Sequence, residues 1–224
     1  RYHPSVLWCD IGGDPAYYRS ASWLERFYAD GAAHHPEGVV ANDRCGLPGD
    51  FATPEYEPVP ATPTRPFEST RGLGASFGYN CNEAVTDYLT DAEAIHTLID
   101  TVAGGGNLLL DIGPRADGTI PRVMRDRLLA MGDWLHINGE AIYGTAPWTG
   151  RGTGTLRYTV GKDGSFYAIA EAWPGKQLVL PATVPVRPSS RVTLLGAKAT
   201  PLHFARRGGK VVVTLPAGWT PAST

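Results

Sequence analysis

Two acidic residues of this 224-residue chain stand where a pair of carboxylates could share one cleft. Asp10 directly follows an apolar run at residues 5 to 9, and Glu68 lies in a short strand-like segment at 66 to 70. Two converging carboxylates suit the cleavage of a glycosidic bond, with one as nucleophile or base and the other as general acid. Asp10 is the expected nucleophile, because Trp8 beside it can exclude water and stack on a sugar ring.

Asp10 also has a purely structural interpretation, as the cap of the helix expected after it. Asp14 is better placed for that role, since it directly precedes Pro15 and proline favours the first helical position. This comparison favours a functional role for Asp10.

The general acid has two candidates. Glu68 stands beside Phe67 and Pro66, a drier position that suits a general acid. Glu55 lies in the proline- and glycine-rich stretch 44–66, where the plain interpretation is a solvated charge. A loop of this length in a compact domain is usually functional or disordered, so both candidates stay open.

Arg44 follows the second expected strand, at 37–43. Its guanidinium could hold a sugar hydroxyl or steady a carboxylate, and a surface salt bridge explains it equally well.

Neither a metal nor a cofactor is expected. His34 and His35 are adjacent, but no third ligand lies at a sensible offset, so we interpret them as surface histidines that precede a strand. The glycines at 104–106 come before a strand, the reverse of the dinucleotide fingerprint. Residues 111–118 lack the closing Glu of a calcium loop.

The elements around these residues alternate between strands and helices. We expect strands at 5–9, 37–43, 66–70 and 107–113, and helices at about 15–30, 91–103 and 121–136. Such alternation predicts parallel β/α units, whose strands end on one face, where active sites are built.

The pattern changes near residue 148. From there on, period-2 segments such as TLRYTV, SFYAIAEAW, RVTLLG and KVVVTL are separated by short turns, which predicts antiparallel hairpins. Tyr158, Phe166, Tyr167 and Trp173 alternate as the core aromatics of a sandwich do. We therefore expect two domains, residues 1–148 and 149–224.

The composition limits the partners. The formal net charge is −2 with both signs dispersed, which argues against nucleic acid as a partner. No apolar run approaches the roughly 20 residues of a membrane span and no charged-then-apolar leader precedes Arg1, so we expect the chain as given to be soluble. The chain does not begin with Met, which leaves open whether a leader or more was lost before it. We interpret Cys9, Cys45 and Cys81 as free thiols, which fits a cytoplasmic and a secreted location alike.

Residues 4–148 resemble the α-L-fucosidase family of glycoside hydrolases. The most specific signals are NLLLDIGPRADGTIP and NGEAIYGTAPW, and LWCD, VVANDRCG, GDFATPEY and ESTRGLGASFGYN precede them in the family's order. The resemblance implies a retaining exo-hydrolase that removes terminal α-L-fucose from glycans or small fucosides. It implies a covalent fucosyl-enzyme intermediate and no metal or cofactor.

By this resemblance Asp10 matches the nucleophile, Trp8 the tryptophan beside it, and Arg44 a sugar-contacting arginine. Some members place the acid/base at the position of Glu68, others at that of Glu55. The sequence departs from the family at three places. Cys45 and Asp111 replace a tryptophan and an asparagine, and Phe67 and Thr70 replace the Trp and Cys of a WExC motif, which places Phe67 in the expected sugar pocket.

Members of the family carry a (β/α)8-like barrel followed by a β-sandwich. The expected fold class is therefore α/β, the second half of such a barrel followed by a small antiparallel β-sandwich. A half-barrel leaves strand edges uncovered. We expect a complementary N-terminal fragment, a homo-oligomer that closes the barrel, or truncation of a longer enzyme. The rival functions are a non-catalytic sugar-binding or structural remnant, and a retaining glycosidase with another specificity, such as galactose.

Overall fold

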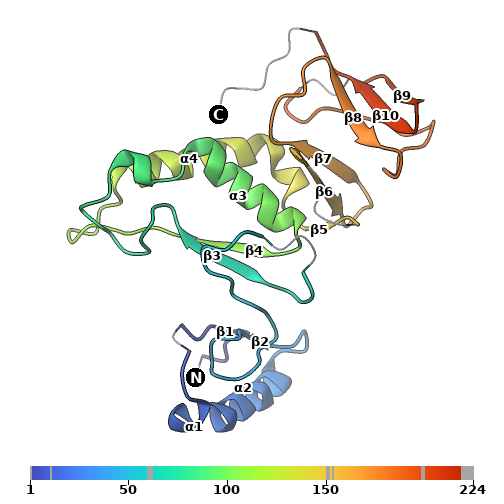
Figure 1. Ribbon diagram of the computed structural model, residues 1–224. Coiled ribbons are helices and arrows are strands. Elements are labelled where there is room, and N and C mark those ends of the chain that lie inside the picture. Colours follow the sequence, from blue (N-terminus) through green and yellow to red (C-terminus); the bar gives the residue numbers. More distant parts are fainter. Residues whose placement is uncertain are drawn as a thin grey trace.

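The computed structural model describes residues 2–10, 12–59, 63–149, 152, 154–197 and 200–217 (Figure 1). Its N-terminal elements are β1 (Val6–Leu7), α1 (Pro15–Tyr18), α2 (Ser20–His34), β2 (Val40–Ala41), β3 (Glu68–Gly72), the 3-10 turn η1 (Val85–Asp87), α3 (Asp91–Ala103), β4 (Asn107–Asp111), α4 (Arg122–Asn138) and the 3-10 turn η2 (Gly139–Ala141). Its C-terminal strands are β5 (Thr145–Pro147), β6 (Leu156–Gly161), β7 (Phe166–Ala170), β8 (Gln177–Pro181), β9 (Phe204–Arg207) and β10 (Lys210–Thr214).

The N-terminal strands are parallel, as predicted. β1 pairs with β2, and β3 pairs with β4. The stretch 44–66 forms no named helix or strand in its described residues, but isolated parallel bridges join Phe51 to Asn42, Ala52 to Phe67 and Glu55 to Thr70. Residues 51–55 therefore run between the two strand pairs and bring the ends of β2 and β3 together.

The predicted helix at 15–30 is two helices, which corrects that expectation. Arg19 adopts a left-handed conformation with φ of 54°, and this breaks the helix between α1 and α2. The indole of Trp23 donates a hydrogen bond to the carbonyl oxygen of Tyr18, next to the break. Asp14 caps α1 by accepting from the backbone N–H of Ala16, as predicted.

The helix α3 has the predicted bounds because both of its ends carry strong local signals. Thr90 caps its first turn and Glu93 bonds back to the N–H of Thr90, a reciprocal capping box. Gly104 is its C-cap. Ile95 and Ile99 of α3 form one apolar cluster with Met124 and Met131 of α4.

The C-terminal strands form two antiparallel sheets, of order β5-β6-β7 and β8-β10-β9, as the period-2 pattern predicts. One apolar cluster joins Tyr158 and Phe166 of the first sheet to Leu180 and Val211 of the second, as in a sandwich.

Three details differ from the expectation for this part. RVTLLG is not a strand, and its Val192 carbonyl accepts a single backbone hydrogen bond, from Leu202. Tyr167 and Trp173 lie outside the core: the Tyr167 hydroxyl donates to Glu140, and Trp173 is 37% exposed.

The domain boundary near residue 148 stays a prediction. The strand β5 lies before it and pairs with β6, which lies after it.

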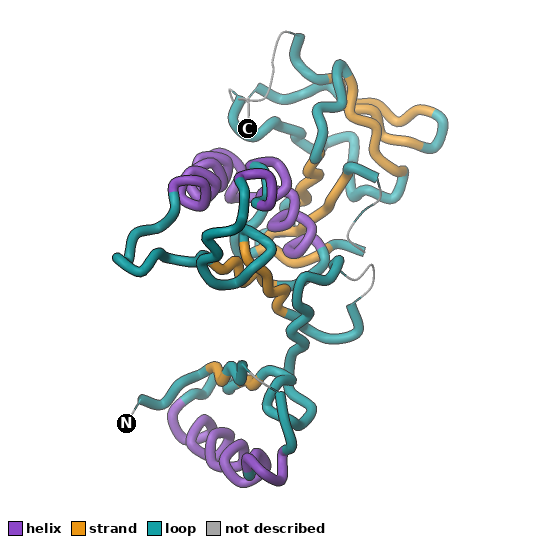
Figure 2. The backbone as a smooth tube through the Cα atoms, turned by 60° about the vertical axis from the view of Figure 1, so that its left-hand side comes forward, coloured by secondary structure: helices purple, strands orange, loops and turns teal. Residues whose placement is uncertain are grey.

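Figures 1 and 2 show β1, β2, α1 and α2 at one end of the molecule and β8, β9 and β10 at the other, with α3, α4, β3 and β4 between them. In the described part of the chain, no helix is long and apolar enough to cross a membrane.

Candidate active site

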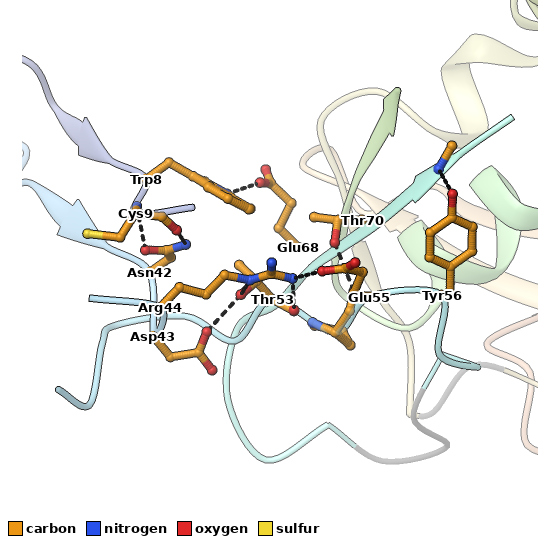
Figure 3. Close-up of polar contacts among 12 residues, drawn as sticks. Trp8, Cys9, Asn42, Asp43, Arg44, Thr53, Glu55, Tyr56, Glu68 and Thr70 are labelled. Carbon is orange, nitrogen blue, oxygen red and sulfur yellow. Dashed lines mark hydrogen bonds and ion pairs between the residues drawn. The ribbon is translucent and has the colours of Figure 1, made fainter. Parts of the chain in front are cut away.

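Trp8 and Glu68 meet where β1 ends and β3 begins. The indole N–H of Trp8 donates a hydrogen bond of 2.6 Å to Oε1 of Glu68, and both side chains are half-buried. Figure 3 shows the indole and the carboxylate pointing toward one another. A hydrogen bond to a carboxylate is short and strong, so it fixes the orientation of the Glu68 carboxyl group.

Arg44 connects this pair to the second candidate acid. Its Nη2 lies 2.7 Å from Oε2 of Glu55, and its guanidinium stacks over the Trp8 ring at 5.1 Å from the centroid. Four predicted site residues, Trp8, Arg44, Glu55 and Glu68, therefore form one connected group, which we call the Trp8–Arg44 cluster (Figure 3).

Thr53 fixes the orientation of the Arg44 guanidinium. Arg44 donates from Nε to the Thr53 hydroxyl at 2.9 Å and from Nη2 to the Thr53 carbonyl at 3.0 Å. The hydroxyl in turn donates to Asp43, whose other oxygen pairs with Arg65. Sequence reasoning missed Thr53, because its role depends on the bridges that align residues 51–55 with β3. No local sequence pattern predicts that pairing.

Asp10 is exposed, and among the described residues it has no hydrogen bond or ion pair. The backbone directly before it is firmly held. Asn42, fully buried, accepts from the N–H of Cys9 and donates to its carbonyl, each at 2.8 Å. Sequence reasoning noted Asn42 only as a polar strand end.

Cys9 and Cys45 form a disulfide, so their assignment as free thiols is wrong. Their separation of 36 residues looked too long for a pair, but the parallel pairing of β1 with β2 brings the ends of both strands together. The bond joins the residue before Asp10 to the residue after Arg44. Cys81 is a free, exposed cysteine, as predicted.

Phe67 lies apart from the cluster. It is 4% exposed and its ring packs against Gly106, where even an added Cβ would collide with it. Adjacent residues of a strand point to opposite faces, so Phe67 and Glu68 face different sides of the sheet. Its proposed contact with a sugar stays a prediction.

Tyr56, which the sequence did not single out, holds the end of β3 and the residues that follow it. Its hydroxyl accepts from the N–H of Gly72 at 3.0 Å and lies 3.3 Å from the carbonyl of Gly74, and Arg71 stacks on its ring. Tyr56 directly follows Glu55, so this brace also fixes the far end of the segment that carries the second candidate acid.

A sequence profile of the family described as Alpha-L-fucosidase matches residues 1–140. The chain belongs to the α-L-fucosidase family. It is 38% identical over 231 residues to the plasma alpha-L-fucosidase of Homo sapiens, covering 96% of this chain and 49% of that protein. It is 36% identical over 210 residues to an alpha-L-fucosidase of Dictyostelium discoideum, covering 88% of this chain and 44% of the relative.

Solved structures of the family agree with this assignment. The α-fucosidase of Thermotoga maritima in complex with fucose is 35% identical and matches the fold with a TM-score of 0.79, over 96% of this chain and 49% of that one. The family resemblance found in the sequence is therefore confirmed. The chain spans about half the length of the relatives it matches.

Proposed function

We propose that this chain supplies the catalytic carboxylates of a retaining α-L-fucosidase. The observation that carries the proposal is the Trp8–Arg44 cluster. In it Glu68 bonds to the Trp8 indole, Glu55 pairs with Arg44, and Arg44 stacks on the indole, close in sequence to Asp10. Family membership and the fucose complex of the Thermotoga maritima relative support α-L-fucosides as the substrate.

In the proposed first step, the Asp10 carboxylate attacks the anomeric carbon. The bond from this carbon to the glycosidic oxygen breaks, and the leaving oxygen takes a proton from Glu68. In the second step Glu68 removes a proton from water, the oxygen of that water attacks the anomeric carbon, and the bond to Asp10 breaks. Fucose is released and both carboxyl groups return to their starting states.

The contacts favour Glu68 over Glu55 as the acid/base. The ion pair with Arg44 requires an ionised Glu55, whereas a general acid must begin the reaction with a proton. Glu68 receives the indole N–H on Oε1, which leaves Oε2 to carry the proton. In this proposal Glu55 holds Arg44 in place against the sugar, and Phe67 supports the strand from behind.

We further propose that the N-terminal half of this chain is the second half of a (β/α) barrel that another segment completes. Val6 of β1, Val40 of β2 and Leu109 of β4 are 51%, 39% and 45% exposed, although they are aliphatic strand residues. β1 and β4 are the outer strands of the parallel arrangement within the described residues. The covering segment is a complementary N-terminal fragment or another copy of the chain, and the mass in solution distinguishes the two.

One alternative has an observation in its favour. The chain spans about half of its relatives, and Asp10 is exposed without a partner in the described structure, which fits a non-catalytic sugar-binding or structural module. This alternative predicts binding of fucose without turnover.

The deciding experiment is the release of nitrophenol from 4-nitrophenyl α-L-fucoside by the 224-residue chain, with Asp10→Asn beside it. We expect turnover by the unaltered chain and a loss of several orders of magnitude in the variant. An inert chain with an intact circular dichroism spectrum would support either the non-catalytic module or a chain that needs the segment that completes the barrel, and adding that segment would distinguish the two.

Two substrates whose leaving groups differ in their need for a proton distinguish the roles of Glu68 and Glu55. Glu68→Gln should strongly slow the hydrolysis of methyl α-L-fucoside, whose leaving group needs a proton, and spare the nitrophenyl substrate in the first step. Glu55→Gln should slow both substrates to a similar degree. The reverse pattern would transfer the acid/base role to Glu55.

A further inference from the structure

Three metal-ligating side chains converge away from the Trp8–Arg44 cluster. His3, Asp30 and His34 each offer one ligand atom, and these atoms all lie within 4.8 Å of one another. Nδ1 of His3 is 2.9 Å from both carboxylate oxygens of Asp30, and Nδ1 of His34 is 3.3 Å from Oδ1. The two imidazole rings are stacked with centroids 3.8 Å apart.

The fold assembles this group from two distant segments. Asp30 and His34 lie four residues apart on α2, so they share one face of the helix near its end. His3 comes from the segment before β1, which the pairing of β1 with β2 brings back over α2. The histidine pair at 34 and 35 was visible in the sequence, but its partner near the start of the chain was not.

His35 holds His3 in position. Its Nε2 donates to the carbonyl oxygen of His3 at 2.7 Å and its Nδ1 donates to Glu37 at 3.0 Å. The backbone of His3 has a φ of 41°, a left-handed conformation that is uncommon for residues other than glycine. Both ring nitrogens of His35 are engaged in these two bonds, so His35 acts as a positioning residue and is no ligand.

We propose that His3, Asp30 and His34 bind a divalent transition-metal ion of the zinc class. Bonds of 2.0–2.1 Å to nitrogen and oxygen place neighbouring ligands of a tetrahedral ion roughly 3.4 Å apart. The separations of 2.9 and 3.3 Å are close to this value, so small side-chain rotations suffice. Two imidazoles and a carboxylate suit zinc better than calcium or magnesium, which prefer oxygen ligands, and water would complete the fourth position.

Binding must displace protons from the ring nitrogens. Nδ1 of His34 now donates to the carbonyl of Asp30 at 2.9 Å, and His3 donates to the Asp30 carboxylate. Each ligating nitrogen needs a free electron pair, so its proton moves to the other ring nitrogen or to solvent. The bound ion would fasten the segment before β1 to α2. This inference does not depend on the proposed function.

The test is an isothermal calorimetric titration of the untagged 224-residue chain with zinc chloride. It is done in a Cys81→Ser background, because the exposed thiol of Cys81 is itself a zinc ligand. We expect one ion per chain with a micromolar dissociation constant. His3→Ala or His34→Ala should weaken binding at least tenfold, and His136→Ala, an exposed histidine of α4, should leave it unchanged.

Cobalt provides a second readout, because its visible absorption reports a tetrahedral site. We expect this absorption when His3, Asp30 and His34 are all unaltered, and we expect the Asp30→Asn variant to lose it. All altered side chains lie on the surface or half-exposed, and circular dichroism verifies folding in each variant. An absence of saturable binding up to millimolar zinc would overturn the inference, as would equal affinity in the His3→Ala, His34→Ala double variant.

Discussion

The indole nitrogen of Trp8 and a carboxylate oxygen of Glu68 are 60 residues apart in the sequence and 2.6 Å apart in space. This hydrogen bond joins the end of β1 to the start of β3. Arg44, at the end of β2, stacks on the same indole. Three successive segments of the parallel arrangement thus contribute to one group of side chains, and the indole is its common member.

Trp8→Phe keeps the ring under Arg44 and removes only the N–H donor. Glu68 becomes charged as it gives up its proton, and a hydrogen bond to a charged group contributes about 1.5–3 kcal/mol. We therefore expect kcat/KM for 4-nitrophenyl α-L-fucoside to fall by roughly 10- to 100-fold. Trp23→Phe is the matched control, because its indole bonds only the backbone carbonyl of Tyr18 within the described structure. Both variants should lose stability in urea, and only Trp8→Phe should lose activity. Equal kinetics in the two variants would remove Trp8 from the site.

The Cys9–Cys45 disulfide should be a major source of stability for the N-terminal part. It closes a separation of 36 residues, and the loss of chain entropy in the unfolded state corresponds to about 4 kcal/mol. We expect the double variant Cys9→Ser, Cys45→Ser to lower the free energy of unfolding by up to that amount, and dithiothreitol to do the same to the unaltered chain. Cys81→Ser is the control and should behave as the unaltered chain. If reductant has no effect on unfolding, the disulfide is absent in solution.

A buried arginine links α3 to the C-terminal sheets. Arg157 of β6 is 8% exposed, pairs with Asp100 of α3 and lies 3.2 Å from Glu171, whose side chain is 9% exposed. Arg157→Met would leave the buried Glu171 carboxylate without this cation. We expect a loss of about 3 kcal/mol in the free energy of unfolding.

Arg122→Met is the control for this prediction. Arg122 pairs with Asp126 at 3.3 Å, but its side chain is 87% exposed. Water screens such a pair, so urea unfolding should change by no more than about 0.5 kcal/mol. Similar losses in the two arginine variants would contradict the assigned role of Arg157.

The sequence predicted best where one segment carries its own signals. α3 has its cap at Thr90 and its stop at Gly104, so its bounds were correct. The alternation of apolar residues predicted the hairpin β6-β7 and the strand β10 for the same reason. It did not predict β9, which lies outside the segment RVTLLG that was expected to be a strand. The break at Arg19 escaped prediction because no glycine marks it.

The candidate site was predicted by residue type but not by contact. The position of Arg44 after the second expected strand and the family resemblance identified Arg44, Glu55 and Glu68. The expectation that Glu68 ends a strand was wrong, because Glu68 is the first residue of β3. The contacts that order them depend on the bridge between residues 51–55 and β3, within a stretch whose composition indicates only a loop. The disulfide and the His3 contact with α2 are likewise long-range, and spacing along the chain gave no sign of either.

Tyr28 makes stability sensitive to alkaline pH. Its hydroxyl donates to Oδ2 of Asp50 at 2.6 Å, and the same oxygen accepts from the N–H of Ala41, so this contact fastens α2 to β2. Burial, followed by the bond to Asp50 and its negative charge, raises the pKa of Tyr28 from 10.0 to about 12. The unfolded chain therefore loses this proton first. The contribution of this contact to the free energy of unfolding is fully present below about pH 10 and is lost as the pH rises toward 12.

We expect urea unfolding of the unaltered chain to show a falling midpoint above about pH 10, with a smaller fall in Tyr28→Phe. Tyr2→Phe is the control, since Tyr2 is 82% exposed and should leave the pH dependence unchanged. The ultraviolet absorbance of phenolate provides a direct check, because one late-titrating tyrosine should disappear in Tyr28→Phe. Burial and the bond to Glu140 raise the pKa of Tyr167 to about 12, so Tyr167 should remain as a second late-titrating tyrosine. An identical late titration in the unaltered chain and in Tyr28→Phe would show that the contact with Asp50 does not hold the phenol proton.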